Sequence, residues 1–165
     1  MKGIEGKFNG VHSSFTALHQ PKPEKKIMIK VLIADDQSMV RNFLQLLLER
    51  ADDIQIVAVA TNGQEAVERT ALYHPTVVVM DVSMPVMDGV EATRQIRADC
   101  PETRVLMVSL YDTPYEIQRS LQAGAFGYLL KDLAREELVS AIRSIQHGNP
   151  YFSNRIVEVA RHFLL

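Results

Sequence analysis

The chain has 165 residues, a formal net charge of −2, 47% hydrophobic and 23% charged residues, which is the balance of one soluble globular domain with a short extension. The charge shows no nucleic-acid-binding surface, and no apolar run approaches the roughly 18 residues of a membrane span, so we expect no contact with a membrane. The only cysteine, Cys100, excludes an intrachain disulfide and a multi-cysteine metal site, and it fits a reducing, cytoplasmic location.

Residues 1–26 show no sustained periodicity and end in a stretch of prolines and lysines. This composition predicts a flexible leader or a cloning remnant, to which we assign no function. From Ile27 onward, short apolar runs alternate with longer amphipathic segments. The apolar runs predict strands at 27–34, 54–60, 76–80, 104–110 and 126–130, and the amphipathic segments predict helices at 38–51, 64–73, 89–98, 114–123 and 134–146.

The predicted strands are nearly continuous runs of Val, Ile, Leu and Met, which indicates burial on both faces. A parallel sheet flanked by helices provides such burial, and right-handed crossovers would then distribute the helices over both faces. The fold class predicted for residues 27–148 is therefore α/β, a (βα)5 doubly wound, five-stranded parallel sheet of the flavodoxin-like kind.

Residues 149–165 predict a linker and the start of a sixth helix. Ser153 is a candidate N-cap. An apolar stripe follows at Ile156, Val159, Ala160 and Phe163. We expect this stripe to be a docking surface whose partner is absent.

Polar side chains stand where the predicted strands end. Each one alone has an ordinary explanation, because an Asp after a strand is commonly a helix cap, a Ser belongs to a turn and a Lys lies in water. Ligands of open α/β sheets bind beyond the carboxyl ends of the strands, so the convergence of all these residues at one rim indicates a site. The residues are Asp35, Asp36, Asp81, Ser109 and Lys131.

Clustered carboxylates at a half-buried rim must take up protons or bind a cation. Asp35, Asp36 and Asp81 offer only oxygen ligands, which predicts Mg²⁺ or Mn²⁺, completed by waters and the backbone carbonyl of Ser83. Zinc is a poor candidate, because the histidines lie in the leader, at helix ends or in the linker.

Mg²⁺ held by few protein ligands normally serves phosphate chemistry. Asp81 is the natural nucleophile, because a carboxylate is already ionised at neutral pH and needs no general base. Lys131 would pair with one phosphoryl oxygen, and the hydroxyl of Ser109 would bind another.

The segments "IADDQ", "MDVSMPVMDG", "VSLYD" and "GAFGYLLKD", each on its expected strand, make residues 27–148 resemble the receiver domain of two-component response regulators. The resemblance implies that Asp81 accepts a phosphoryl group from a sensor histidine kinase, and that the protein is a phosphorylated switch rather than an enzyme with a separate substrate. It implies that Asp35 and Asp36 bind Mg²⁺ and that Ser109 and Lys131 sense the phosphate. It also implies that Tyr128 rotates between outward and inward positions as Ser109 moves. The ordinary alternative for Tyr128 is an aromatic side chain packed on an edge strand.

"GYLLKD", "AREELVSAIRSIQHG" and "YFSNRIVEVARHFLL" are most similar to regulators of the NarL/LuxR type. The resemblance implies control of transcription, with DNA contact only through a helix-turn-helix output domain that is not in these 165 residues. Two positions depart from the usual pattern. Thr76 stands where an acidic residue commonly follows the proline, far from the rim. Tyr111 is bulky at a position that screens attacking water, which bears on the lifetime of the phosphorylated state.

The surface expected to respond to phosphorylation spans residues 112–146. We expect a partner or homodimer contact there, on the basis of the apolar and aromatic residues near it, which are Tyr111, Tyr115, Tyr128, Leu129 and Leu133.

Three other functions fit the sequence less well. A haloacid-dehalogenase-like phosphatase would carry its nucleophile on the first strand and a second Asp two residues later, where this chain has Ser83. A dinucleotide-binding domain would need a glycine-rich turn where this chain reads "ADDQS". A degenerate receiver acting only as a scaffold would not need the full set of site residues.

Overall fold

A computed structural model describes the backbone of residues 26–164 and the side chains of residues 26–162. The predicted leader, apart from Lys26, lies outside the described residues. Strands and helices alternate along the chain, and the five predicted strands and five predicted helices are all present close to their predicted bounds. The strands are β1 (Ile29–Ala34), β2 (Ile54–Ala60), β3 (Val77–Asp81), β4 (Arg104–Ser109), β5 (Gly127–Leu130) and β6 (Tyr151–Phe152). The helices are α1 (Ser38–Glu49), α2 (Gly63–Tyr73), α3 (Gly89–Asp99), α4 (Pro114–Gln122), α5 (Ala134–Gln146) and α6 (Asn154–Leu164), with a short 3-10 helix η1 (Lys131–Leu133) before α5.

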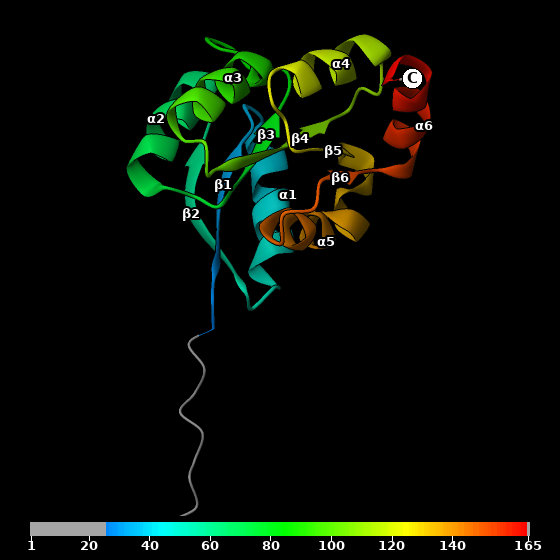
Figure 1. Cartoon of the computed structure of the whole chain (residues 1–165). Helices are drawn as coiled ribbons and strands as arrows, with labels where there is room; N and C mark the ends of the chain where they lie inside the picture. The colour runs from blue at the N-terminus through cyan, green and yellow to red at the C-terminus, as the bar shows by residue number, and fades with distance from the viewer. Residues whose placement is uncertain (1–25, 165) are drawn as a thin grey trace, which may run out of the picture.

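The strands of the described residues form one parallel sheet in the order β2-β1-β3-β4-β5-β6 (Figure 1). The order reverses next to β1, because the chain first adds β2 on one side and then crosses to β3 on the other. Ala34 of β1 pairs with Met80 of β3, so the residues that follow β1 come to lie beside the end of β3. Such a reversal leaves a crevice beyond the strand ends, which is where ligands bind in this architecture.

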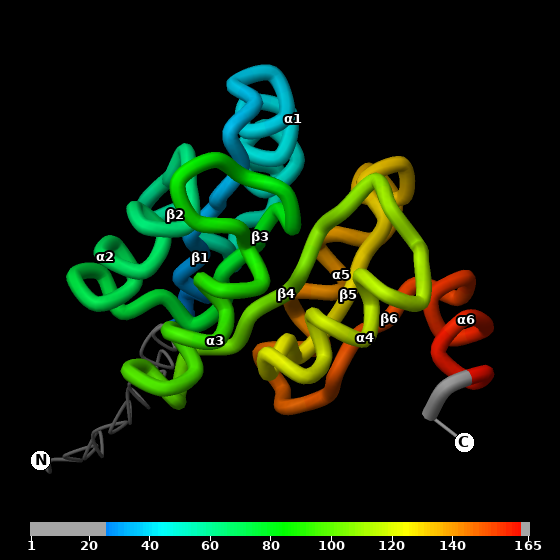
Figure 2. Tube along the Cα trace, turned by 90° about the horizontal axis from the view of Figure 1, so that it is seen from above, coloured from blue at the N-terminus to red at the C-terminus, as the bar shows by residue number. Residues whose placement is uncertain are grey.

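Helices cover both faces of the sheet, as Figure 2 shows from above. Alternate strand residues point to opposite faces and build two cores. One core joins β1, β3 and β4 to α1 and α5 through residues such as Val31, Val79, Leu48 and Leu138. The other joins the same strands to α2, α3 and α4 through residues such as Leu32, Met80, Ile96 and Ile117. Burial of each large aliphatic side chain stabilises the fold by about 1.5–3 kcal/mol.

A sixth strand was not predicted. β6 has only two residues, and it pairs in parallel with Gly127 and Tyr128 of β5. A side chain at position 127 would clash, because an added Cβ atom would lie 2.6 Å from the carbonyl oxygen of Tyr151. The glycine therefore allows the chain after α5 to close over the β5 edge, and the sheet is one strand wider than expected.

The expectation that the apolar stripe of α6 lacks its partner is wrong. Ile156 is fully buried and Val159 packs on the same core, and α6 lies against α4 beside the sheet (Figures 1 and 2). Arg155 at the start of α6 also forms an ion pair of 2.5 Å with Asp112, in the loop before α4. The surface that covers the stripe thus belongs to this chain, while the side chain of Phe163 lies outside the described residues.

Ser153 stands directly before α6, where the N-cap was predicted, but its hydroxyl is used differently. Its backbone carbonyl accepts the first helical hydrogen bonds, from Ile156 and Val157. The buried hydroxyl instead donates to Glu137 of α5, which also accepts a hydrogen bond from the hydroxyl of Tyr151. The side chain therefore joins the C-terminal segment to α5 rather than capping α6.

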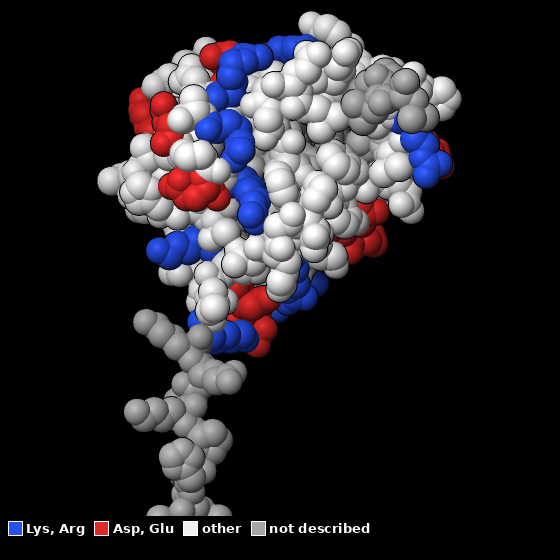
Figure 3. All heavy atoms as spheres, in the orientation of Figure 1, with Lys and Arg blue, Asp and Glu red and all other residues white. Residues whose placement is uncertain are grey.

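The surface expected over residues 112–146 is only partly open. Tyr128 and Leu129 are fully buried, so two of the residues that motivated this contact face the interior. Tyr128 is also not on an edge strand, because β6 pairs outside β5. Tyr111 and Tyr115 remain exposed. On the face shown in Figure 3, Lys and Arg form a column beside α3, and few charges lie over α4.

Within residues 26–164, the structure contains no helix that combines the length and the apolar character needed to cross a bilayer.

Candidate functional site

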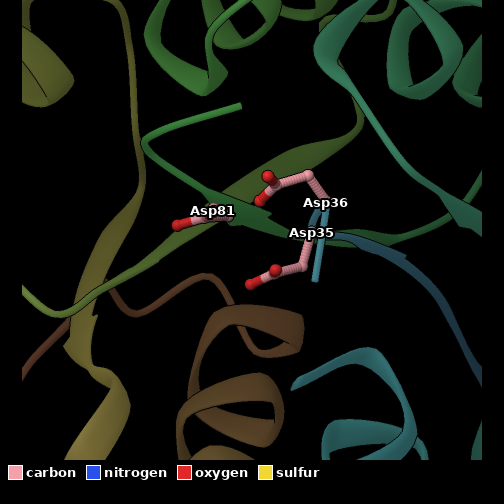
Figure 4. A group of neighbouring side chains, drawn as sticks. All are labelled: Asp35, Asp36 and Asp81. Atoms are coloured by element: carbon pink, nitrogen blue, oxygen red, sulfur yellow. The ribbon is translucent and has the colours of Figure 1, made fainter. Parts of the chain in front are cut away.

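Three acidic side chains meet at the crevice beside β1. Asp35 and Asp36 follow β1, and Asp81 is the last residue of β3. One carboxylate oxygen of each lies within 4.8 Å of those of the other two, and the three carboxylates point to the same side of the strand ends (Figure 4). Asp35 and Asp81 are buried, whereas Asp36 is exposed. The convergence predicted for these acids is therefore present.

Lys131 joins this cluster from the end of β5, which β4 separates from β3. It begins η1 after β5, and its Nζ atom lies 2.7 Å from Oδ2 of Asp35 and 3.1 Å from Oδ1 of Asp81. Its side chain is only 11% exposed. The lysine thus bridges two carboxylates from two different strands and offsets part of their mutual repulsion.

Close packing of α3 against β3 fixes the position of Asp81. The amide of Gly89, the first residue of α3, donates to the carbonyl of Val82. An added Cβ atom at Gly89 would come within 1.8 Å of the carbonyl oxygen of Asp81. Only glycine allows this approach, which explains why α3 begins with Gly89.

The environment of Asp81 disfavours its charged form. Burial raises the pKa of Asp81 to about 6 from an ordinary 3.8, and the charge of Asp35 adds to the rise while Lys131 opposes it. Burial also lowers the pKa of Lys131, but its hydrogen bond to Asp35 and the charge of Asp81 outweigh this effect, so its pKa lies above the ordinary value. The positive charge of Lys131 therefore offsets only part of the negative charge of the three carboxylates.

The other predicted site residues line a small cavity in front of Asp81. The cavity has a volume of ≈ 80 Å³ and includes Ser83, Ser109 and Lys131, together with Gln37, Leu110 and Tyr111. Asp81 lies at its wall. A small anion such as a phosphoryl group would meet a hydroxyl and an ammonium there.

The loop after β4 links this cavity to Tyr128. The amide of Tyr111 donates to Oγ of Ser109 over 3.0 Å, and the hydroxyl of Tyr128 donates to the carbonyl of Tyr111 over 2.8 Å. Burial raises the pKa of Tyr128 to about 12, so its hydroxyl stays protonated and can donate. Tyr128 therefore occupies an inward position and holds the loop that carries Ser109.

Sequence reasoning missed two contacts around Asp35. The amide of Gln37 donates to Oδ1 of Asp35 over 2.9 Å. The Nη1 atom of Arg41, on α1, donates to the carbonyls of Asp35 and Asp36. An arginine on an amphipathic helix gives no signal of such a role, because most arginines there are solvated.

The cluster fits a hard divalent cation. Among the described residues, three carboxylates face one ammonium, and Lys131 is already shared between Asp35 and Asp81. Asp36 adds an exposed carboxylate at the opening. Oxygen ligands without histidine suit Mg²⁺ or Mn²⁺. The contribution of the Ser83 carbonyl stays a prediction.

Comparisons with known proteins agree with this architecture. The family model for the response regulator receiver domain matches residues 31–143. The transcriptional regulatory protein LnrK of Bacillus subtilis is 40% identical over 121 residues, which are 73% of this chain and 55% of LnrK. The oxygen regulatory protein NreC of Staphylococcus carnosus is 35% identical over 129 residues, which are 78% of this chain and 59% of NreC. This chain therefore spans somewhat more than half the length of these curated relatives.

Among solved structures, a two-component response regulator of the LuxR family from Aurantimonas sp. SI85-9A1 superposes with a TM-score of 0.79. It is 31% identical, and the superposition covers 84% of this chain and 99% of that one.

Proposed function

The chain belongs to the response regulator receiver domain family, and on this premise we propose that it is a NarL/LuxR-type switch that a sensor histidine kinase phosphorylates on Asp81. The observation that carries the proposal is the position of Lys131 between Asp35 and Asp81. The ammonium of a lysine held there can exchange its carboxylate partner for a phosphoryl oxygen once Asp81 is phosphorylated. The switch is a signalling protein, and its chemistry is limited to its own modification.

The residues present support in-line phosphoryl transfer. An Oδ atom of Asp81 attacks phosphorus while the bond from phosphorus to the donor nitrogen breaks, and the electron pair of that bond stays with the donor. Mg²⁺ held by Asp35, Asp36 and Asp81 would offset the charge of the two meeting anions. Lys131 and the hydroxyl of Ser109 would bind phosphoryl oxygens, because both line the cavity in front of Asp81.

Phosphorylation would then act on the loop after β4. When Ser109 turns toward the phosphoryl group, it pulls on the amide of Tyr111 and so on the carbonyl that Tyr128 holds. Reversal of a 99:1 equilibrium needs roughly 5.5 kcal/mol of differential stabilisation, which a few charge-assisted hydrogen bonds and a metal ion can supply.

The C-terminal segment lies beside this switch. The carbonyl of Tyr128 accepts a hydrogen bond from the amide of Ser153. The ion pair between Asp112 and Arg155 joins α6 to the loop after β4. We therefore propose that α6 moves together with the surface formed by α4, β5 and α5. A homodimer contact on that surface would have to use its exposed residues, such as Tyr115.

Control of transcription is a further part of this proposal. LnrK is named a transcriptional regulatory protein, and it extends well beyond the matched region. DNA binding would require such a region. The phosphatase alternative gains no support, because position 83, two residues after Asp81, is a serine that protonates a leaving group poorly.

Incubation with acetyl phosphate and Mg²⁺, followed by intact mass measurement, tests the proposal. We expect the gain of one phosphoryl group that hydroxylamine removes and that is absent in Asp81→Asn. Asp52→Asn is the matched control, because Asp52 is an exposed acid outside the cluster. No gain of mass, or the same gain in Asp81→Asn, would contradict the proposal, and steady hydrolysis of a phosphate ester would favour the phosphatase.

A further inference from the structure

The guanidinium of Arg41 reaches across the turn between β1 and α1. Its Nη1 atom lies 2.7 Å from the carbonyl oxygen of Asp35 and 2.9 Å from that of Asp36. One nitrogen thus holds two successive carbonyls of the segment that supplies two of the three acids. Hydrogen bonds from a charged donor are among the stronger ones in proteins.

Asp36 depends on this contact more than Asp35 does. The carboxylate of Asp35 is buried and is held by the amide of Gln37 and the ammonium of Lys131. The carboxylate of Asp36 is exposed, and within residues 26–162 it forms no ion pair or side-chain hydrogen bond. Its direction therefore follows from its backbone, and Arg41 fixes that backbone.

The choice of carbonyls as acceptors has a chemical consequence. A guanidinium bound to the carboxylates would compete with a divalent cation for the same oxygens. Arg41 donates to the main-chain oxygens of the turn, so the carboxylate oxygens of Asp36 remain free for a metal. The positive charge of Arg41 by itself would repel a divalent cation and lower the affinity for it. Its hydrogen bonds to the main chain would raise that affinity, so the two effects have opposite signs.

We propose that Arg41 is a positioning residue that raises the affinity of the acidic cluster for a divalent cation by fixing the main chain of Asp35 and Asp36. We call this contact of Arg41 with the two carbonyls the clamp. This inference rests on the proposed function, because it needs the cluster to bind Mg²⁺ or Mn²⁺. Groups that orient metal ligands without touching the metal typically change metal affinity by about 10–100-fold.

Titration of the full chain with Mn²⁺, with free Mn²⁺ measured by electron paramagnetic resonance, tests the clamp without any phosphorylation. Arg41→Met removes both hydrogen bonds and the charge, and we expect the Kd for Mn²⁺ to rise about tenfold. Arg41→Lys keeps the charge and one nitrogen donor. Its Kd for Mn²⁺ should therefore lie between that of the unsubstituted chain and that of Arg41→Met. Arg50→Met is the matched control, because Arg50 is an exposed arginine just after α1, and its Kd should not change.

A double-variant cycle distinguishes a clamp on Asp36 from a general loss of structure. If Arg41 acts through Asp36, then Arg41→Met should weaken Mn²⁺ binding much less when Asp36 is already Asn. Unchanged or tighter binding in Arg41→Met would overturn the clamp, since loss of charge alone predicts tighter binding. Additive losses in the double variant would also overturn it. Failure of the unsubstituted chain to bind Mn²⁺ would overturn both the clamp and the metal dependence proposed above.

Apparent affinity for Mg²⁺ in phosphorylation provides a second measurement. Arg41→Met should need more Mg²⁺ for half-maximal phosphorylation but reach the same maximal rate, because the nucleophile and Lys131 are untouched. A lowered maximal rate with unchanged Mg²⁺ dependence would contradict a positioning role.

Discussion

The hydroxyl of Tyr128 on β5 donates a hydrogen bond of 2.8 Å to the backbone carbonyl of Tyr111, in the loop after β4. The same loop carries Ser109 at the end of β4, and the backbone of Tyr128 accepts from Ser153 just before α6. One buried tyrosine therefore connects the loop beside Asp81 to the C-terminal segment.

Tyr128→Phe should loosen the loop while leaving the core packed. The ring is retained and one hydrogen bond is lost, so we expect the free energy of unfolding to fall by about 1 kcal/mol. Urea denaturation measures this loss, and amide hydrogen exchange should show faster opening of residues 109–113. Tyr115→Phe, at an exposed tyrosine of α4, is the control. Equal exchange in both variants would show that the hydrogen bond does not hold the loop.

Asp81→Asn should stabilise the metal-free fold at neutral pH. The pKa of Asp81 is about 6 in the folded protein against an ordinary 3.8, so the folded state binds its proton more tightly. The contribution of this carboxyl to stability is therefore full below about pH 4 and is lost as the pH rises through about 6. Replacement by Asn removes the cost of the charge, about 2–3 kcal/mol at pH 7.

Urea denaturation in EDTA at several pH values measures this effect. The advantage of Asp81→Asn over the unsubstituted chain should shrink as the pH falls from 7 to 4. A variant that is less stable than the parent at pH 7, by an amount independent of pH, would contradict the assigned cost.

Lys131→Met should move the pH dependence of phosphorylation upward. The charge and hydrogen bond of Lys131 lower the pKa of Asp81, so their removal should raise this pKa. Because the nucleophile must be ionised, the rate with acetyl phosphate should fall at neutral pH and recover at higher pH. Initial rates at saturating Mg²⁺ measure the midpoint, and Lys30→Met, at an exposed lysine of β1, should leave it in place. An unmoved midpoint in Lys131→Met would be inconsistent with the bridge.

Gly89→Ala should disrupt the site through packing. The added Cβ atom would overlap the carbonyl oxygen of Asp81, so α3 must move and the free energy of unfolding should fall by about 3 kcal/mol. Gly148→Ala is the comparison, because Gly148 has a φ of 87° but its added Cβ atom meets only the end of Arg104 at 3.8 Å. Backbone strain alone should cost about 1–2 kcal/mol there. If urea denaturation showed equal losses of unfolding free energy in Gly89→Ala and Gly148→Ala, the close approach of Gly89 to Asp81 would not be what makes the first substitution costly.

Ile156→Ala should weaken the docking of α6. Ile156 is fully buried in the core that contains Tyr128 and Ile117, and its truncation should cost about 2–3 kcal/mol if α6 unfolds with the domain. Hydrogen exchange of the α6 and α4 amides should accelerate, while Glu158→Ala on the exposed face should leave it unchanged. Protection of α6 equal to that in the parent would show that α6 does not depend on this contact.

Local sequence patterns determined most of the strands and helices of this protein and which residues meet at its candidate site. Continuous apolar runs identify β1 to β5, since a strand buried on both faces has no polar side, and helical spacing identifies α1 to α5. A parallel sheet brings its strand ends together, so Asp35, Asp36, Asp81 and Lys131 could be assigned to one rim before their distances were known. These features follow from short-range periodicity and from one rule of topology.

Other features were decided only by the tertiary structure. β6 is too short to show a period, and it exists because Gly127 lets residue 151 approach β5. The stripe of α6 showed that one side of that helix must be covered, but only packing places α4 against it. Arg41 bonds to main-chain carbonyls, which every residue has, so no residue pattern marks its partners. Periodicity reports that a face is buried, whereas the group that buries it depends on how distant segments come together in space.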